Sequence, residues 1–597
     1  MRRLPFALLA IAIVWIAALV QRGLPLGWDE VEFFRATKWI SEGQVPFRDF
    51  WEHHTPLQWF VFAPVAWFVN GPGVESIVAM RWAQVPLWIA IFALLFALVK
   101  EVDARARWTA LALLLASAPF VFKAAEYRVD VLGNLAFVAA LYVVERWLMR
   151  RRPASAPPES EAGTPLDQPA ERGRSAWLLF GALMSLAVLA NMRLAPLVVL
   201  TAIVLLVRER SVRPLWMSAG VAVVAALFVG YLFATGAWRP FLDEAVFYNL
   251  NHRKVVFTEP TFWRTLFAVS TADVASAAFW LLGIGGAVLA WRTPLRVLTL
   301  LLALSILTVA TQDVHYDYHF HTTLLLMLPL AALALARVSE SWRNVVLAVL
   351  AVGLVIDFAQ LVPTYGRELD YQDQVMTAAD RLTLPGETVF DGVGWALRRT
   401  PAYRHWFLPS GTRFMAARKL LRTSYDAPHL AANPPAAVIF DYRVDLWFEI
   451  HPELARYTVR HYVPVYRNLW VPGMTALVGP QPLRIGWVAP RAGAYDVWSS
   501  ELLAKHPWLT EPEVYVDIRG AQAARMAIPL DRLPPLPADA LQWRVDGALQ
   551  PRGARTLTLR KGSRVELLAT PGARAGVLLV PRGITTLCLA PEDDFVF

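Results

Sequence analysis

The sequence is poor in cysteine and in charged side chains. Its one cysteine, Cys588, excludes an internal disulfide and any metal site built from several thiolates. Charged residues make up 18% of the 597 positions, against about 25% in soluble domains, and hydrophobic residues reach 56% with a mean hydropathy of +0.41. These proportions exclude an ordinary soluble enzyme, because so much apolar surface needs a second solvent.

The apolar residues are distributed unevenly along the chain. Residues 1–361 carry successive runs of Leu, Ala, Val and Trp, whereas 362–597 have the composition of ordinary globular sequence. About eleven runs approach the roughly 20 residues that cross a bilayer, so a single-pass anchor is also excluded. These predicted spans are 4–20, 82–99, 108–122, 129–148, 176–191, 194–207, 215–234, 276–291, 295–310, 321–336 and 343–361.

Basic residues are concentrated on one side of the predicted membrane. With the N-terminus in the cytoplasm, the short cytoplasmic loops are rich in arginine, whereas the short external turns carry only Lys123, Arg128 and Arg193. The usage of Ala, Arg, Leu and Pro is typical of bacteria, so we expect a multi-pass protein of the bacterial inner membrane. An odd number of spans places 362–597 outside the cytoplasm. Cytoplasmic loops account for the net charge of +9, and no nucleic acid partner is expected.

Acidic residues gather at the external face. Asp29 and Glu30 follow the first predicted membrane helix in a long external loop, 21–81, and Asp130 begins another membrane helix. Ionisable groups at this depth are costly and usually functional. A solvated loop start or a helix cap remains the alternative explanation for the Asp29–Glu30 pair. The apolar residues between Val31 and Ile40 recur at helical spacing, which predicts an amphipathic surface helix, and 57–69 predicts a second interfacial helix.

The external turn at 311–321 contains three of the eleven histidines, His315, His319 and His321. Imidazole and carboxylate groups at these spacings are able to bind a divalent metal or a phosphate. Interfacial polar residues without a special task give the same pattern. A second external loop, 235–275, is polar enough to cover a substrate, although a structural loop is the simpler interpretation.

A set of spaced residues in the first external loop carries a family resemblance. The set is Asp29-Glu30-x-x-Phe33, Ala36, Ile40, Gly43, Pro46, Asp49, His54-Thr55-Pro56-Leu57 and Trp59. Together these residues resemble the first loop of the membrane glycosyltransferases that use polyprenyl-phosphate sugars. This GT-C group includes protein O-mannosyltransferases, lipid A aminoarabinose transferases and lipopolysaccharide sugar transferases. The resemblance covers about residues 1–361. Phe33 replaces the usual Tyr, Thr55 replaces the first Pro of a Pro-Pro pair, and His54 falls where the aminoarabinose enzymes have Lys.

The resemblance implies a GT-C membrane glycosyltransferase that moves a sugar from a polyprenyl-phosphate donor to a lipid, glycan or protein acceptor. Such a reaction needs a base for the acceptor hydroxyl and charge stabilisation for the departing phosphate, and an in-line displacement inverts the anomeric centre. Asp29 is the first choice for the base, and Glu30 and Asp130 would orient the acceptor, hold a metal or position an arginine. The residues expected to meet the donor are Arg128, His53, His54, Arg193, His315 and His319. Alternatively, Arg193 extends its charged end to the membrane surface without contacting the donor. The sequence does not decide whether a divalent cation serves as a cofactor.

Two other classes of function compete with the enzyme. A transporter or flippase of lipid-linked sugars should carry ionisable residues at mid-membrane or broken helices in paired halves, and neither pattern is visible in the sequence. A membrane scaffold that binds glycans through its C-terminal region is the third class. The expected partners are the sugar donor, membrane lipids and the acceptor.

The C-terminal region predicts two external domains after the transmembrane domain 1–361. Residues 362–480 mix helix and strand patterns and predict an α/β domain, with helices at Tyr371–Leu382 and Pro452–His461 and strands at Thr388–Phe390, Ala436–Asp441 and Tyr466–Val471. Residues 481–597 predict an antiparallel β-sandwich. Its expected strands are Leu483–Trp487, Tyr495–Trp498, Val514–Ile518, Leu541–Val545, Thr556–Leu559, Val565–Leu568 and Gly576–Val580.

Overall fold

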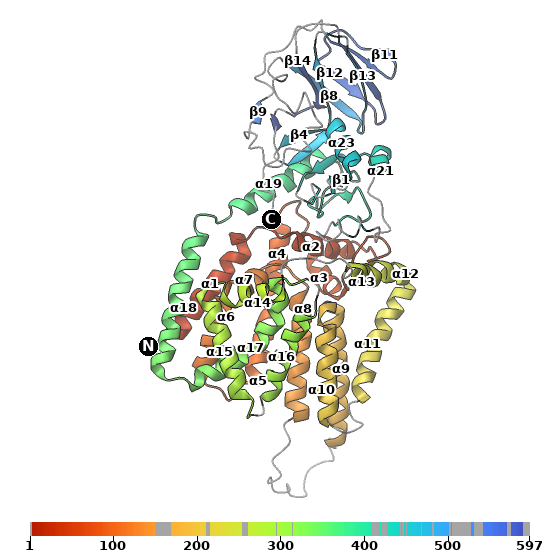
Figure 1. Cartoon of the computed structure of the whole chain (residues 1–597). Coiled ribbons are helices and arrows are strands. Elements are labelled where there is room, and N and C mark those ends of the chain that lie inside the picture. The colour runs from red at the N-terminus through yellow and green to blue at the C-terminus, as the bar shows by residue number, and fades with distance from the viewer. Residues whose placement is uncertain are drawn as a thin grey trace, which may run out of the picture. The chain divides into compact units, whose positions relative to one another are not determined.

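The computed structural model divides the chain into two compact units. The helical unit comprises Met1–Asn70 and Glu75–Leu369, and the C-terminal unit comprises Gly71–Val74 and Asp370–Phe597 (Figure 1). The residues that the structure describes are 3–149, 169–209, 215–252, 261–293, 295–312, 314–407, 415, 418, 427–441, 443–444, 447–448, 451–466, 468–479, 481, 483–500, 503, 527–529, 541–569, 575–584 and 586–588.

The helical unit is built from helices and short helical turns. They are α1 (Leu4–Ala18), η1 (Leu19–Gly23), α2 (Trp28–Ser41), α3 (Leu57–Phe68), α4 (Glu75–Ala83), α5 (Val85–Leu98), α6 (Ala104–Leu115), α7 (Ala118–Ala125), α8 (Asp130–Val143), η2 (Val144–Met149), α9 (Pro169–Ala190), η3 (Met192–Leu194), α10 (Ala195–Glu209), α11 (Leu215–Ala234), α12 (Trp238–Phe241), η4 (Leu242–Phe247), α13 (Tyr248–His252), α14 (Phe262–Thr271), α15 (Val274–Ala290), α16 (Arg296–Ala310), η5 (Asp317–Phe320), α17 (His321–Arg337) and α18 (Glu340–Leu361). A further helix, α19 (Arg367–Leu382), leads into the C-terminal unit.

Several helices are long and apolar enough to cross a membrane. Among the described residues there are five, or seven if each of two bent helix pairs is one span. The five are Leu4–Gly23, Glu75–Leu98, Leu215–Ala234, Asp317–Arg337 and Glu340–Leu361. The bent pairs are α6 with α7 and α14 with α15, and four shorter apolar helices lie at Leu57–Phe68, Arg174–Ala190, Met192–Val207 and Arg296–Ala310. The count of about eleven spans therefore stays a prediction.

Local structure refines the expected spans. The predicted span 108–122 is broken at Ser117, where α6 and α7 meet at 74°, and Pro119 stands in the first turn of α7, where its missing N–H costs nothing. The helices expected between Val31 and Ile40 and at 57–69 are present as α2 and α3. Nearly every side chain of α2 is buried, so α2 does not have the exposed polar face expected of a surface helix. The interfacial position of α3 stays a prediction.

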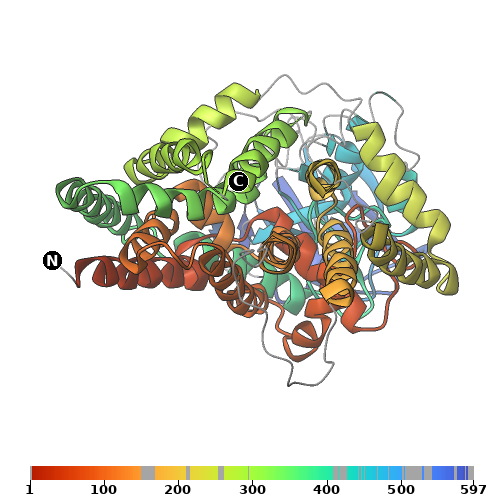
Figure 2. The same cartoon turned by 90° about the horizontal axis from the view of Figure 1, so that it is seen from below.

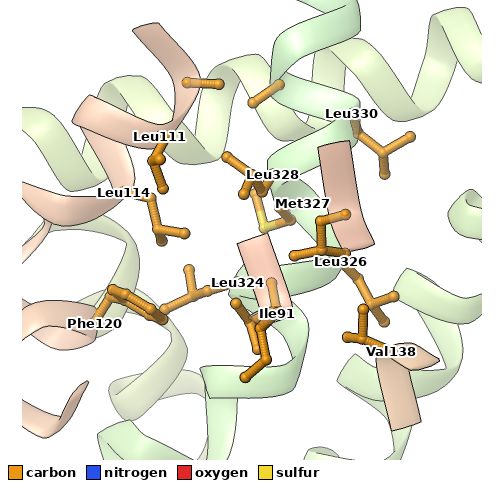
Figure 3. Close-up of a cluster of buried hydrophobic side chains, with 14 of the residues drawn as sticks. Ile91, Leu111, Leu114, Phe120, Val138, Leu324, Leu326, Met327, Leu328 and Leu330 are labelled. Atoms are coloured by element: carbon orange, nitrogen blue, oxygen red, sulfur yellow. The ribbon is translucent and has the colours of Figure 1, made fainter. Parts of the chain in front are cut away.

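The core of the helical unit is organised around α17, of which most side chains are buried. Figure 3 shows Leu324, Met327 and Leu328 of this helix among Ile91 of α5 and Leu111 of α6. On its other side α17 approaches α15 closely. A β-carbon at Gly286 would lie 1.9 Å from the carbonyl oxygen of Leu330, so only glycine permits this distance between the two helices. The packing fixes the first turn of α17 and the η5 turn before it.

Other helices expose apolar side chains. Figure 2 looks at several helices of this unit close to end-on, and α11 packs against α9. Along α11, Val223, Leu227 and Phe233 are exposed, as expected of side chains that face lipid tails. The interior of the unit and its lipid-facing surface are therefore both apolar, and polar side chains stand out wherever they cluster.

The C-terminal unit contains a mixed five-stranded sheet in the order β2-β1-β3-β5-β4. Its strands are β1 (Thr388–Phe390), β2 (Thr400–Pro401), β3 (Ala437–Ile439), β4 (Tyr462–Tyr466) and β5 (Leu469–Pro472), with helices α21 (Ala427–Ala432) and α23 (Pro452–His461) in the same segment. The first three strands pair in parallel and the last two in antiparallel fashion. The helix predicted at Pro452–His461 and the strand predicted at Thr388–Phe390 are confirmed with those bounds.

Two four-stranded antiparallel sheets follow, in the orders β11-β10-β13-β7 and β12-β8-β14-β6. Trp487 and Trp543 from the first sheet share one apolar cluster with Tyr495 and Val577 from the second, so the sheets form a sandwich. The strands are β6 (Met474–Val478), β7 (Leu483–Val488), β8 (Gly493–Ser500), β10 (Leu541–Val545), β11 (Ala548–Leu549), β12 (Thr556–Leu559), β13 (Arg564–Ala569) and β14 (Ala575–Pro581), with β9 (Ala527–Pro529) and β15 (Thr586–Cys588) in a separate pair. The strand predicted at 514–518 lies outside the described residues, and the division into three domains stays a prediction.

Candidate active site

The start of α2 presents two acidic side chains with different surroundings. Gly27 precedes the helix in an extended conformation, and the Glu30 side chain turns back to accept a hydrogen bond from the Gly27 N–H at 3.0 Å. Acidic residues in the first helical turn are favoured by the helix dipole. The local sequence therefore explains why Asp29 and Glu30 stand here.

Glu30 is a buried anchor between three segments. Its carboxylate accepts two hydrogen bonds from Arg81 of α4, from Nε at 2.8 Å and from Nη2 at 2.6 Å. It also accepts the Tyr127 N–H at 2.8 Å, so both oxygens are occupied. Arg81 in turn donates to the carbonyl oxygens of Leu24 and Pro25. This geometry suits a residue that positions α2 against the turn before α8.

Asp29 is partly exposed, with 24% of its side-chain surface accessible. Its Oδ2 lies 3.3 Å from Nη1 of Arg128, which comes from the turn between α7 and α8. The Asp29 carboxylate is thus held by a cation and still reachable from outside.

Arg128 connects the acidic residues. Its buried guanidinium donates to Asp130 Oδ2 at 2.9 Å and to Glu126 Oε2 at 3.0 Å, besides its contact with Asp29. Burial alone would lower the pKa of Arg128, but Asp130, Glu126 and Asp29 raise it well above its ordinary value. Burial raises the pKa of Glu126, against the opposing effects of Lys123 and Arg128. Arg128 therefore stays charged at any working pH.

Asp130 links the turn to the break between α9 and α10. Its Oδ1 accepts a hydrogen bond from Asn191 Nδ2 at 2.8 Å. Asn191 is extended, which ends α9, and its Oδ1 accepts the Arg193 N–H at 3.1 Å. The sequence Asn191-Met192-Arg193 therefore both interrupts the apolar helix and fixes the place of Arg193.

A small open pocket, referred to below as the cavity, lies beside this network. Its polar lining comes from Asp130, Asn191, Arg193, Ser305, Thr308, Gln312, Tyr318, His319, Thr322 and Thr323. Two arginines approach the ring of Tyr318, with guanidinium-to-centroid distances of 4.1 Å for Arg128 and 5.0 Å for Arg193. Arg193 is exposed, and its guanidinium has no ion-pair partner among the described residues. The cavity therefore offers an accessible cation, Arg193, beside the carboxylate of Asp130.

The structure separates the predicted site residues into groups. Asp29, Arg128 and Asp130 share one network, while Arg193 and His319 line the cavity beside it. His315 lies apart, with its ring against Phe262 and its carbonyl oxygen accepting from Thr265 Oγ1. The first-loop histidines, His53 and His54, belong to a different cluster with Glu32 and Glu52.

Sequence reasoning did not select Arg81, Asn191 or Tyr318. Arg81 precedes an apolar run, and Asn191 interrupts one, so a polar residue at the edge of a predicted span was the available signal. Tyr318 stands within the histidine-rich turn, and nothing local distinguishes it from Tyr316.

Comparison with known proteins supports the fold. No family model and no curated protein matches the sequence. Crystal structures of ArnT from Cupriavidus metallidurans, in the apo state and bound to undecaprenyl phosphate, are similar with a TM-score of 0.54 at 14% and 13% identity, covering 78% of this chain and 97% of that one. A crystal structure of an Archaeoglobus fulgidus oligosaccharyltransferase in complex with Zn and sulfate has a TM-score of 0.41 at 13% identity, over 76% of this chain and 71% of that one. The chain therefore has the GT-C fold.

Proposed function

We propose that this chain transfers a sugar from a polyprenyl-phosphate carrier to an acceptor hydroxyl at the outer face of the bacterial inner membrane. The observation that carries the proposal is the pairing of Asp29, which is partly exposed, with Arg128, beside a cavity that presents Arg193. A reaction that deprotonates one oxygen and releases a phosphate needs a carboxylate and cations side by side. ArnT, whose structure is similar to that of this chain, has been crystallised with undecaprenyl phosphate bound, which supports the choice of donor.

In the proposed reaction Asp29 accepts the proton of the acceptor hydroxyl. The acceptor oxygen then forms a bond to the anomeric carbon, while the bond between that carbon and the phosphate oxygen breaks and its electron pair stays on the phosphate. Arg193 is accessible and meets the developing charge, and Arg128 holds the Asp29 carboxylate in place. Attack from the side opposite the phosphate inverts the anomeric centre.

The other site residues have positioning roles in this proposal. Glu30 has both carboxylate oxygens occupied, so it anchors α2 to α4 instead of taking a proton. Asp130 holds Arg128 and Asn191, and through Asn191 the chain segment that carries Arg193. His319 lies in the cavity wall, where its Nδ1 accepts the Tyr316 N–H. His53, His54 and His315 lie outside this network and have no direct part in the reaction.

The proposal includes a membrane topology. About eleven spans with the N-terminus in the cytoplasm put the start of α2, the turn before α8 and η5 on the external side. The same topology puts the predicted domains 362–480 and 481–597 outside, where an acceptor lipid, glycan or protein is found. Support comes from the apolar helices and from the bias of arginine toward the predicted cytoplasmic loops.

Transfer assays on the purified full-length protein test the proposal. A panel of radiolabelled polyprenyl-phosphate sugars is incubated with a membrane extract and wild type, Asp29→Asn or the control Glu101→Gln, whose side chain is 81% exposed on the opposite side. Transfer by wild type and the control, with loss in Asp29→Asn and retained donor binding, is expected. If all three proteins bind the donors equally and none transfers sugar, the proposal of an enzyme is wrong and a transporter or a scaffold is favoured.

A further inference from the structure

Four metal-ligand side chains converge in the first external loop, away from the Asp29–Arg128 network. Glu32 lies on α2, and Glu52, His53 and His54 are consecutive in the loop between α2 and α3. One ligand atom from each residue lies within 4.8 Å of the other three. The chain therefore brings two carboxylates and two imidazoles around one point.

The distances within this Glu32/Glu52/His53/His54 cluster fit a tetrahedral metal. Nδ1 of His53 lies 3.1 Å from Glu32 Oε1 and 3.9 Å from Glu52 Oε1. Nδ1 of His54 lies 3.0 Å from Glu52 Oε1 and 3.7 Å from Glu32 Oε1. Neighbouring ligands of a tetrahedral zinc ion, with bonds of about 2.0–2.2 Å, stand roughly 3.4 Å apart. The observed spacings are distributed around that value.

Both carboxylates of the cluster lie in the protein interior. The side chains of Glu32 and Glu52 are 1% and 0% exposed, and Glu52 Oε2 is buried without a hydrogen-bond partner among the described residues. Buried carboxylates are stable when they pair with a cation or coordinate a metal, and one divalent ion contacts both carboxylates at once.

The ligands are held in place by the surrounding chain. The His53 ring stacks on Trp51 at 5.0 Å, and the His54 ring meets Phe33 edge to face at 5.2 Å. Glu52 Oε1 accepts the backbone N–H groups of His53 and His54 at 2.8 and 2.9 Å, which fixes the carboxylate. Rigid ligands with supporting contacts are characteristic of metal sites rather than of solvated loops.

We propose that Glu32, Glu52, His53 and His54 bind a first-row divalent metal ion, with zinc the best fit to two imidazoles and two carboxylates. The ion ties the loop before α3 to the first turns of α2, the helix whose first turn carries Asp29. Its role is to hold this segment, and no step of sugar transfer passes through it.

Metal analysis of the full-length protein tests the site. The protein, purified without a histidine tag, is stripped with a chelator, reloaded with Zn²⁺, desalted and analysed by mass spectrometry for metal content. Wild type should retain one zinc ion per chain, and Glu52→Gln and His54→Gln should each lose it. Glu42→Gln, at the residue that follows α2, and His451→Gln in the C-terminal unit are matched controls that should keep it.

Cobalt provides a second readout that does not depend on the variants. Reloading wild type with Co²⁺ should give the intense visible absorption of a tetrahedral nitrogen–oxygen site, and Zn²⁺ should remove it. Thermal unfolding of the stripped protein should occur at lower temperature than that of the loaded protein. A wild-type chain that retains no stoichiometric Zn²⁺ or Co²⁺, or Glu52→Gln that retains as much as Glu42→Gln, would overturn the proposal, whatever the transferase assay shows.

Discussion

Asp29 and Arg128 are 99 positions apart in the sequence, and their side chains meet at 3.3 Å. The contact joins the first turn of α2 to the turn before α8. Arg128 also contacts Asp130 and Glu126, so it holds three carboxylates that would otherwise repel each other. Of these three, Asp29 is the most exposed, which makes it the one that a substrate reaches.

Neutralising Asp29 should abolish sugar transfer without unfolding the protein. Asp29→Asn keeps the shape of the side chain and removes the base, so transfer should fall by about 10²–10⁴-fold. Donor binding and the unfolding temperature should stay close to wild type. The assay is initial-rate transfer of radiolabelled sugar, with Glu101→Gln as the control. A residual rate within a few-fold of wild type would assign the base elsewhere.

Breaking the Glu30–Arg81 ion pair should destabilise the folded protein. Both side chains are buried, and Glu30→Gln leaves the Arg81 charge without its partner, at a cost of about 3–5 kcal/mol. The expected result is a clear decrease in the unfolding temperature of the detergent-solubilised protein. Replacing both residues, as in Glu30→Gln with Arg81→Met, should recover part of the loss, because no buried charge is then left unpaired. An unchanged unfolding temperature in the single variant would contradict the anchoring role.

Removing the Arg193 charge should weaken donor binding. A hydrogen bond to a charged group contributes about 1.5–3 kcal/mol, so Arg193→Gln should raise the dissociation constant for a polyprenyl phosphate by about 10–100-fold. The dissociation constant of Arg193→Lys should lie between those of wild type and Arg193→Gln, because lysine keeps the charge but lacks the planar guanidinium group. Binding is measured by titration in detergent.

The control for Arg193 is Arg174→Gln. Arg174 is exposed at the opposite end of α9 and lies over the Trp216 ring. Its loss should leave donor binding unchanged. Equal weakening by both substitutions would indicate general electrostatic attraction instead of a specific phosphate contact.

His405 should make the C-terminal unit sensitive to acid. Burial lowers the pKa of His405 from 6.5 to about 3, so the folded unit keeps the ring neutral while the unfolded chain takes up a proton below pH 6.5. Stability from this group is therefore complete at neutral pH and is lost as the pH falls. Between pH 7 and pH 5 the loss should be about 2 kcal/mol.

Hydrogen exchange of β1 and β3 in the full-length protein measures this effect. The pKa of Asp441 is raised by burial to about 6, so Asp441 opposes His405 over part of the same pH range. Comparison with His405→Gln removes the Asp441 contribution, because both proteins retain it. Hydrogen exchange gives the free energy of the opening that exposes the β1 and β3 amides. The difference in this free energy between wild type and His405→Gln should become smaller from pH 7 to pH 5. A constant difference would show that His405 has the same pKa in the folded unit as in the unfolded chain.

Much of the local structure was predictable. The helix at Pro452–His461 and the strand at Leu541–Val545 were expected with the bounds that the structure has, since each has the periodicity or alternation of its element. The span expected at 108–122 is instead two helices that meet at 74°, because Pro119 favours the start of a new helix. The average hydropathy of a segment does not reveal such a break.

The sequence by itself indicated a multi-pass membrane protein with a strand-rich C-terminal region. Apolar runs and the alternation of apolar and polar residues are local patterns that can be read directly from the order of residues. It also marked Asp29, Arg128 and Asp130 through their place at the ends of apolar runs. Only the tertiary structure decided that Glu30 pairs with Arg81, that Arg193 faces the cavity and that His53 and His54 join Glu32 and Glu52. These contacts depend on how helices pack, and residues separated by tens of positions leave no periodic trace of their pairing.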